Sequence, residues 1–389
     1  MSEKRKIELY IHIPFCERKC LYCDFLSAPA GDTEKKAYVD QLIAEIRAQG
    51  VVMSGTEVTT IFIGGGTPSV LPGLMIFNIL SAVYESFAVM SGAEITIECN
   101  PGTLDEGKVR YYREAGINRV SLGLQSADNA DLQRLGRIHT YEDFLKSYDL
   151  LRKAGFDNVN VDLMSAIPQQ SVKSWRDTLN RVLLLKPEHI SAYSLQLEEG
   201  TPFYERYSSE EGRKELPDED AEREMYADTK RILMQHGYHR YEISNYARPG
   251  KECRHNTGYW TGAEYLGVGL GASSLILNHR YHSLRDMNAY LSVRMDRDLT
   301  PLFQDLEGLS LEDRMEEFMY LGLRLMRGVS GQDFYDRFSQ NMFQVFGPQI
   351  RKNEVLKLLE VDMPVVRLTD RGIDVSNRVF ADFYHALKR

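Results

Sequence analysis

The chain has 389 residues, of which 43% are hydrophobic and 26% are charged. This composition is typical of soluble globular proteins and excludes the disordered, collagenous and coiled-coil classes. The formal net charge is −9, so the chain lacks the dense positive field that non-specific nucleic-acid binding needs. At roughly 150 residues per domain, the length suggests two or three domains. We therefore predict a multidomain protein without a nucleic-acid partner.

The sequence predicts neither a membrane span nor a secretion signal. The most apolar stretch, residues 76–89, is interrupted by Asn78, Ser81, Glu85 and Ser86, and a spanning helix needs about 18 apolar residues or more. Residues 1–6 are polar and lead directly into a strand-like segment. We expect a cytoplasmic protein, in which the five cysteines are thiols or metal ligands and do not form a disulfide framework.

Short β-rich segments alternate with amphipathic stretches over the first two hundred residues. Repeated strand and helix units of this kind predict a parallel sheet, which is either open or curled into a barrel. The six expected strands are residues 8–13, 59–63, 94–98, 119–124, 158–164 and 189–196. The expected crossover helices are residues 34–49, 73–86, 104–115, 141–154 and 172–185.

The residues that directly follow these strands are rich in thiols, glycine and carboxylates. In parallel α/β folds the ligands bind at the carboxyl ends of the strands, so these positions are where chemistry is expected. In chain order they are the Cys16 segment, residues 64–68, residues 98–101, Gln125 and residues 162–168.

The last part of the chain has a different pattern. A helix is expected over residues 218–236, and from Tyr241 the sequence becomes dense in Gly, Tyr, His and Trp. We predict domains at 1–240, 241–308 and 309–389. The third contains helices at 311–327, 331–338 and 349–359, followed by strands at 365–368 and 373–375, a turn at 369–372 between them, and a final helix. This order favours a small winged-helix-like domain. DNA binding by it is disfavoured by the net charge, and the simpler interpretation is a packing module.

Cys16, Cys20 and Cys23 form a C-x3-C-x2-C run directly after the first expected strand. Structural zinc takes four closed ligands, so three thiolates suit a [4Fe-4S] cluster better, with one iron left open to chelate a small molecule. Two alternatives remain at this point. One is a zinc site completed by His12 or Asp24, and the other is three unrelated buried cysteines.

The cysteine loop, with Gly64-Gly-Gly-Thr-Pro68 after the next strand, resembles the radical S-adenosylmethionine (SAM) superfamily. The segment Tyr10-Ile-His-Ile-Pro-Phe-Cys16 resembles more narrowly the branch that contains oxygen-independent coproporphyrinogen III oxidase and the HemW heme chaperones. The resemblance runs over nearly the whole chain. It implies an α/β fold with a partial, TIM-like (β/α)6 barrel, followed by a C-terminal α+β extension.

The resemblance also implies roles for matching positions. Cys16, Cys20 and Cys23 would hold the cluster. Glycine suits the loop after the second strand because a Cβ would block close backbone approach, and a phosphate-loop alternative fails because no Lys-Ser/Thr follows. Without the resemblance, polar residues at strand ends would more simply stabilise loops. The positions implied to contact SAM are Tyr10, Tyr22, Gly65, Gly66, Thr67, Glu98, Gln125, Arg137, Asp162 and, on a weaker match, Gln196.

Two features separate the chain from the oxidases. The oxidases carry a fourth cysteine two residues after the third, and here Asp24 and Phe25 follow Cys23, so oxidase activity is not expected. The segment from His255 to Trp260 resembles the His-Asn-x-x-Tyr-Trp motif of the heme chaperones. His255 with Tyr259 and Trp260 would then supply an axial ligand and an aromatic surface for heme. His279, His282 and Cys253 are alternative ligands, and a purely structural role for His255 is the competing interpretation.

The resemblance therefore implies a heme chaperone that passes heme to acceptor proteins such as respiratory enzymes. Its expected cofactors are a [4Fe-4S] cluster, SAM and heme. In this interpretation the expected partners include a second copy of the chain, in a homodimer, and a membrane surface that the protein touches peripherally. The rival hypotheses are a radical SAM enzyme that acts on a tetrapyrrole, a related methylase or cyclopropanase, and an interaction module that uses its winged-helix end.

Overall fold

A large open sheet dominates the computed structural model, which describes residues 4–387, so that the first three residues of the polar start discussed above lie outside it. Six parallel strands in sequence order form its centre. β1 pairs with β9 and β6 pairs with β8, so the described strands do not close on themselves. The prediction of a partial (β/α)6 barrel is confirmed. The six strands are β1 (Lys6–Ile13), β2 (Glu57–Gly65), β3 (Ala88–Cys99), β4 (Arg119–Gln125), β5 (Val159–Ser165) and β6 (His189–Ser194).

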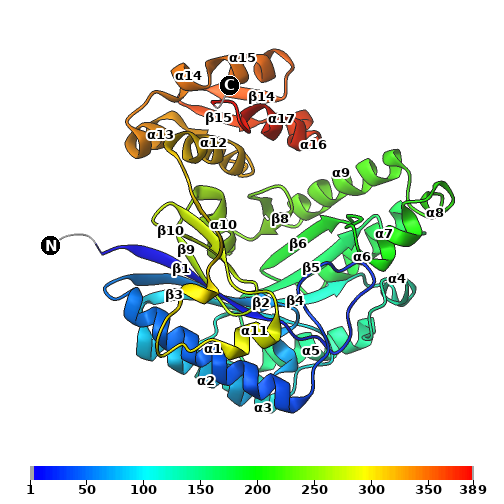
Figure 1. Ribbon diagram of the computed structural model, residues 1–389. Coiled ribbons are helices and arrows are strands. Elements are labelled where there is room, and N and C mark those ends of the chain that lie inside the picture. Colours follow the sequence, from blue (N-terminus) through cyan, green and yellow to red (C-terminus); the bar gives the residue numbers. More distant parts are fainter. Residues whose placement is uncertain (1–3, 388–389) are drawn as a thin grey trace.

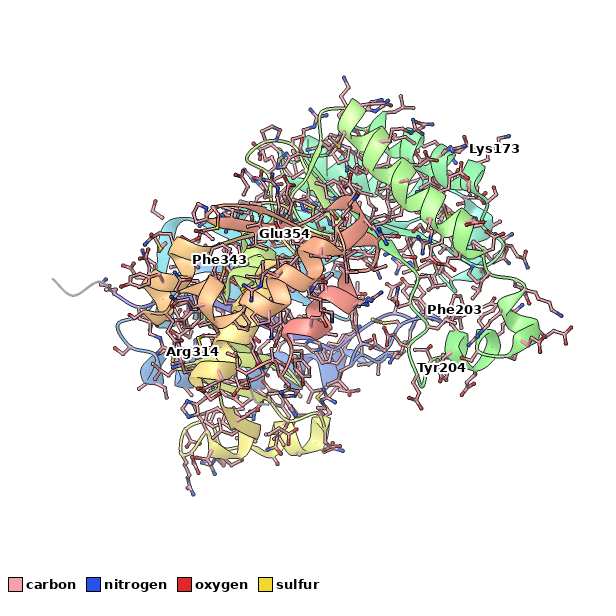
Figure 2. The ribbon with its side chains drawn as sticks, turned by 90° about the horizontal axis from the view of Figure 1, so that it is seen from above. Lys173, Phe203, Tyr204, Arg314, Phe343 and Glu354 are labelled. Carbon is pink, nitrogen blue, oxygen red and sulfur yellow. The ribbon has the colours of Figure 1, made fainter. Side chains whose placement is uncertain are left out.

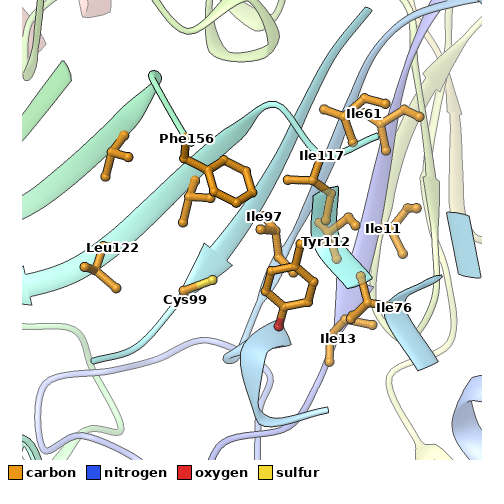
Figure 3. Close-up of a cluster of buried hydrophobic side chains, with 14 of the residues drawn as sticks. Ile11, Ile13, Ile61, Ile76, Ile97, Cys99, Tyr112, Ile117, Leu122 and Phe156 are labelled. Atoms are coloured by element: carbon orange, nitrogen blue, oxygen red, sulfur yellow. The ribbon is translucent and has the colours of Figure 1, made fainter. Parts of the chain in front are cut away.

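Helices follow each central strand and cover the outer face of the sheet (Figure 1). Their starts are encoded locally: Thr140 and Ser171 each form a capping box, which satisfies free backbone N–H groups in the first turn. Their apolar sides pack on buried strand residues such as Ile61, Ile97 and Leu122 (Figure 3). The helices are α1 (Asp32–Val52), η1 (Pro68–Val70), α2 (Gly73–Ser86), α3 (Glu106–Glu114), α4 (Asn129–Arg134), α5 (Tyr141–Lys153) and α6 (Val172–Leu183).

The middle segment extends the sheet at both of its edges. β9 runs parallel to β1, whereas β8 runs antiparallel to β6. Buried Leu266 and Val268 of β9 belong to the same hydrophobic core as the barrel. The elements are α7 (Pro202–Tyr207), α8 (Glu210–Arg213), α9 (Glu219–Gln235), β7 (His239–Arg240), β8 (Asn245–Ala247), α10 (Arg254–Thr261), β9 (Tyr265–Val268), β10 (Ser273–Ile276), β11 (His279–His282), α11 (Met287–Ser292), η2 (Thr300–Leu302) and β12 (Gln304–Gly308).

The C-terminal elements form a separate lobe with its own core around Phe334, Phe346 and Phe383. Figure 1 shows the lobe above α10, with α12 as its nearest helix and the central strands further away. In Figure 2 it carries Arg314, Phe343 and Glu354, whereas Phe203 and Tyr204 of α7 lie at the far side. Its elements are α12 (Leu311–Gly322), β13 (Val329–Ser330), α13 (Gly331–Phe338), α14 (Met342–Val345), α15 (Gly347–Val355), β14 (Leu359–Asp362), β15 (Val365–Leu368), α16 (Asp370–Asp374) and α17 (Ser376–Phe383).

The expected hairpin of the lobe lies one segment earlier than predicted. β14 pairs antiparallel with β15, and the predicted strand at 373–375 is wrong because Asp370–Asp374 form α16. The local reason is Thr369, whose Oγ1 accepts a hydrogen bond from Gly372 N at 3.0 Å and so caps a helix where a turn was expected. The helix expected over 349–359 ends at Val355, because the chain then turns into β14, which begins at Leu359.

In the described part of the chain, no helix has both the length and the apolar character that a bilayer crossing requires.

Candidate cluster and cofactor site

The three cysteines lie in the loop between β1 and α1, and each is half-buried. Backbone hydrogen bonds hold the start of this loop: Cys16 N donates to Ala28 O at 3.1 Å, and Thr67 N donates to Phe15 O at 2.7 Å. The second bond ties the cysteine loop to the glycine loop that follows β2. The two motifs that the sequence singled out are therefore neighbours at the carboxyl ends of adjacent parallel strands.

The zinc alternative finds no support in this geometry. Within residues 4–387, no three His, Cys, Asp or Glu side chains converge tightly enough to hold one metal ion. His12 is buried, and its two ring nitrogens already pair with Tyr10 OH and Leu26 O, each at 3.0 Å. Asp24 is exposed to solvent. A four-iron cluster binds each thiolate through a different iron, so three separated thiols on one loop suit it.

A chain of hydrogen bonds connects two of the cysteines through the strand ends. Cys16 Sγ contacts Thr67 Oγ1 at 3.5 Å, and Asn100 Nδ2 donates to the same oxygen at 2.9 Å. Arg137 Nη2 donates to Asn100 Oδ1 at 2.9 Å, and Arg137 Nη1 donates to Cys20 Sγ at 3.4 Å. A guanidinium against sulfur stabilises a thiolate. Asn100 lies within residues 98–101, where the sequence predicted chemistry, but it was not among the positions named as SAM contacts.

The third thiol resists ionisation in the metal-free loop. Burial, and then the neighbouring Cys20 and Cys16, raise the pKa of the Cys23 thiol to about 11. Metal ligation requires the thiolate, so a cation must supply the free energy that deprotonates it. Burial also raises the pKa of the Cys99 and Cys253 thiols, which lie outside the loop, so the assignment of Cys23 to the cluster rests on its place in the loop.

The glycine loop approaches the cysteine loop closely enough to exclude a side chain. Gly65 has φ +114°, in the region that glycine favours, and its N–H donates to Glu98 Oε2 at 3.1 Å. A Cβ built on Gly66 would lie 2.6 Å from Phe15 O, which is a backbone atom and cannot turn away. The predicted requirement for glycine in this loop therefore has a direct steric cause.

Substituting Gly66 with alanine is expected to lower the free energy of unfolding by about 2 kcal/mol, because the two loops must separate to admit the methyl group. Urea unfolding of the cluster-free protein measures this. The matched control is Gly31→Ala, since a Cβ at Gly31 meets no atom within 4 Å. Equal stability of the two variants would show that the loops do not need this close contact.

Two carboxylates meet inside the barrel. Burial, followed by the charge of Asp162, raises the pKa of Glu98 to about 8. Asp162 is also half-buried, and burial raises its pKa, although Asn160 Nδ2 and Ser121 Oγ donate to its two oxygens at 2.7 and 2.9 Å. Glu98 lies next to the end of β3 and Asp162 at the middle of β5, and carboxylates at these places can take hydrogen bonds from amino or hydroxyl groups of a ligand.

The other residues predicted to contact SAM lie in different surroundings. Tyr10 OH bonds His12 Nδ1, and the ring of Tyr22 lies 6.2 Å from that of Phe203. Gln125 ends β4 with φ 72°, an uncommon conformation for this residue, at an irregularity in the β4 to β5 pairing. Gln196 is exposed and lies two residues beyond the end of β6, which stops at Ser194 and not at 196 as predicted.

The aromatic motif lies at the opposite end of the strands from the cysteines. His255 is 1% exposed on α10; its Nδ1 pairs with Thr60 Oγ1 at 2.7 Å and its Nε2 with Tyr259 OH at 2.9 Å. Burial, and then Arg119, lower the pKa of His255 to about 3, so the ring is neutral and both of its nitrogens are satisfied. Glu94 accepts from His255 N at 3.1 Å and so anchors the start of α10.

Trp260 continues the motif toward the C-terminal lobe. The guanidinium of Arg324, just beyond α12, lies 4.3 Å from the centre of its ring, close enough for a cation–π interaction. The Nε1 of Trp260 is buried without a hydrogen-bond partner among the described residues. As the structure stands, the motif closes the amino-terminal end of the barrel and joins it to the lobe.

Comparison with known proteins supports these observations. The model of the "Radical SAM superfamily" matches residues 10–182, and that of the "HemN C-terminal domain" matches residues 309–375. The chain is 37% identical to a protein of Lactococcus lactis named "Heme chaperone HemW", over 96% of each chain. It is 34% identical to the protein of that name from Bacillus subtilis, over 96% of this chain and 98% of that one. The chain belongs to the HemW family of radical SAM proteins.

The fold of this HemW family member has a counterpart among solved structures. Coproporphyrinogen III oxidase (HemN) from Escherichia coli superimposes with a TM-score of 0.85 over 98% of this chain and 90% of its own, at 23% identity. Membership of the radical SAM superfamily implies a [4Fe-4S] cluster and SAM. The residues present fit both groups. Three thiols lie on one loop, a guanidinium lies beside one of them, and the glycine loop lies so close to the cysteine loop that a Cβ on Gly66 would clash with it.

Proposed function

We propose that this HemW-family protein is a heme chaperone: it binds heme, carries a SAM-chelating [4Fe-4S] cluster and transfers heme to acceptor proteins such as respiratory enzymes. The carrying observation is the identity of 37% over 96% of both chains with a protein named a heme chaperone. We further propose that it works in the cytoplasm, as a homodimer, and reaches acceptors by peripheral membrane contact. The proposed division at residues 240 and 308 assigns these tasks to a barrel, an extension and a terminal lobe.

In this proposal Cys16, Cys20 and Cys23 hold the cluster, which when bound supplies an electron and one open iron. The N–H groups of the glycine loop already donate within the protein, so the loop offers its backbone carbonyls and the Thr67 hydroxyl to the amino-acid end of SAM. Arg137 already donates to Cys20, Asn100 and Gly123, and it offers a further N–H to the methionyl carboxylate. Other cofactor-binding positions proposed from the family motifs are Tyr10, Tyr22, Gly65, Gly66, Thr67, Glu98, Gln125, Asp162 and Gln196.

The segment after Cys23 supports a chaperone over an oxidase. Phe25 stands where the oxidases carry a fourth cysteine, and it is 62% exposed. An exposed aromatic side chain beside a cluster loop offers an apolar contact and no sulfur ligand. We propose that the decarboxylation of coproporphyrinogen III is not among the activities of this chain.

The hydrogen bonds of His255 and His279 indicate which of the two rings has a nitrogen free to ligate heme. For His255 to reach iron, its ring must release Thr60 and Tyr259. His279, at the tip of the β10 to β11 hairpin, is exposed, and its Nδ1 pairs with Leu277 O at 2.9 Å, which leaves Nε2 without a partner among the described residues. A ligating histidine commonly donates its other N–H to a carbonyl. We propose His279 as the ligand in this conformation, and, when α10 is displaced, His255 as the ligand with Tyr259 and Trp260 as the aromatic surface for heme.

Anaerobic reconstitution tests the function. Cluster-loaded protein is mixed with hemin, its optical and spin-resonance spectra are recorded, and a heme-free respiratory acceptor is then added. The expected results are a ligated-heme spectrum and heme appearing in the acceptor. Formation of protoporphyrinogen from coproporphyrinogen III, SAM and a reductant would instead identify an oxidase.

A further inference from the structure

A line of buried polar groups runs through the barrel from Asp162 toward α10. Asn160 Nδ2 donates to Asp162 Oδ1 at 2.7 Å, and Asn160 Oδ1 faces His189 Nδ1 at 2.6 Å. His189 Nε2 faces Tyr241 OH at 2.8 Å, and Cys253 N donates to that hydroxyl at 3.3 Å. Asn160 is 2% exposed and His189 is 0% exposed, so water does not compete for these bonds.

Every donor in this line points the same way. Asp162 only accepts when it is ionised, so the Asn160 amide must turn its NH₂ toward the carboxylate and its oxygen toward His189. Burial holds the pKa of His189 well below its ordinary value, so the ring is neutral; Nδ1 then carries the proton and Nε2 accepts from the Tyr241 hydroxyl. We call this line, consisting of Cys253 N, Tyr241, His189 and Asn160, the relay.

The relay begins at the helix that carries the aromatic motif. Cys253 is the residue before α10, its Sγ contacts Glu94 Oε1 at 3.5 Å, and Glu94 also accepts from His255 N. Asp162, at the middle of β5, and the start of α10, at the amino-terminal end of the barrel, are therefore connected by hydrogen bonds. Displacing α10 would withdraw the donor that fixes the Tyr241 hydroxyl.

We propose that Tyr241 and His189 are positioning residues that orient the Asp162 carboxylate for SAM and couple its orientation to the seating of α10. This inference rests on the proposed function, because it takes Asp162 as a SAM contact. Ser121 Oγ donates to the second carboxylate oxygen at 2.9 Å and accepts from Asn160 Nδ2 at 2.7 Å, and Ser191 Oγ donates to Asn160 Oδ1 at 3.2 Å. The relay therefore acts together with these two serines on the amide that faces the first carboxylate oxygen.

The test begins with Tyr241→Phe, which removes one hydroxyl and keeps the ring. SAM affinity of the cluster-loaded full chain is measured by anaerobic equilibrium dialysis with labelled SAM. A fivefold to tenfold weaker affinity is expected. The matched control is Tyr148→Phe, which deletes another buried hydroxyl that donates to a backbone carbonyl, Leu185 O at 3.0 Å, outside the relay. The control is expected to stay within twofold of the wild type.

A double-mutant cycle separates positioning from general damage. If Tyr241 acts through Asp162, then Tyr241→Phe changes SAM affinity by less than twofold in an Asp162→Ala background. The same fivefold to tenfold loss in both backgrounds would overturn the proposal.

A measurement without SAM distinguishes failure of the inference from failure of the cofactor assignment. In cluster-free protein labelled with ¹⁵N-histidine, the Nδ1–H signal of His189 is expected to move in both Asp162→Ala and Tyr241→Phe and to stay in place in Tyr148→Phe. A wild type that binds no SAM refutes the cofactor assignment only. A His189 signal indifferent to Asp162 refutes the relay, whatever SAM does.

Discussion

Replacing Cys20 with serine is expected to leave the reconstituted protein with less than about one tenth of its wild-type iron and sulfide. A hydroxyl is a far weaker ligand for cluster iron than a thiolate, and the loop offers only three thiols to begin with. The substitution also removes the sulfur that faces Arg137. Iron and acid-labile sulfide per chain, with the visible absorbance of the cluster, measure the result.

Cys99→Ser is the matched control for this prediction. Cys99 is 3% exposed at the end of β3 and lies outside the loop. Its substitution is expected to keep nearly all of the iron and sulfide. A Cys20→Ser protein that retained a full cluster would show that the ligands lie elsewhere, and the assignment of the loop would fall with it.

Substituting His255 with alanine is expected to lower the free energy of unfolding by about 3 kcal/mol or more. The change removes a buried ring and leaves a cavity. Thr60 Oγ1 and the Tyr259 hydroxyl also lose their hydrogen-bond partner. Chemical denaturation of the heme-free protein measures it. His279→Ala, which trims an exposed ring, should change stability by no more than about 0.5 kcal/mol.

The same pair of variants reports on heme. If α10 keeps the position described above, His279→Ala is expected to weaken heme binding at least tenfold, because the proposal takes Nε2 of His279 as the ligand. A His255→Ala protein that remains folded should bind heme as the wild type does. The reverse pattern, with loss of heme only in His255→Ala, would show that α10 opens to bind it.

Much of the barrel was predictable, because buried parallel strands are short, apolar and followed by polar residues. All six central strands and their crossover helices lie where the sequence predicted them, with end shifts of three residues or fewer except at β3, which begins at Ala88, six residues before the predicted start at 94. The contacts between the cysteine and glycine loops also follow from parallel pairing, since β1 and β2 end side by side.

Other features depend on non-local packing that the pattern does not record. The predicted motif role of His255 came from family resemblance, and only the fold shows that Thr60, 195 positions away, occupies its ring. Asn100 and Asn160 are common polar residues whose importance comes from their neighbours in space. In the terminal lobe, a single cap at Thr369 converted an expected strand into a helix.

The pairing of β9 with β1 has a practical consequence for dissecting the chain. Four residues of β9 cover the backbone of β1 on the side away from β2. A truncation at residue 240 would leave β1 as a naked edge, with Leu9 and Ile11 newly accessible to other chains. Such a fragment is expected to aggregate through this edge. Studies of the isolated barrel should therefore retain the chain through at least Val268.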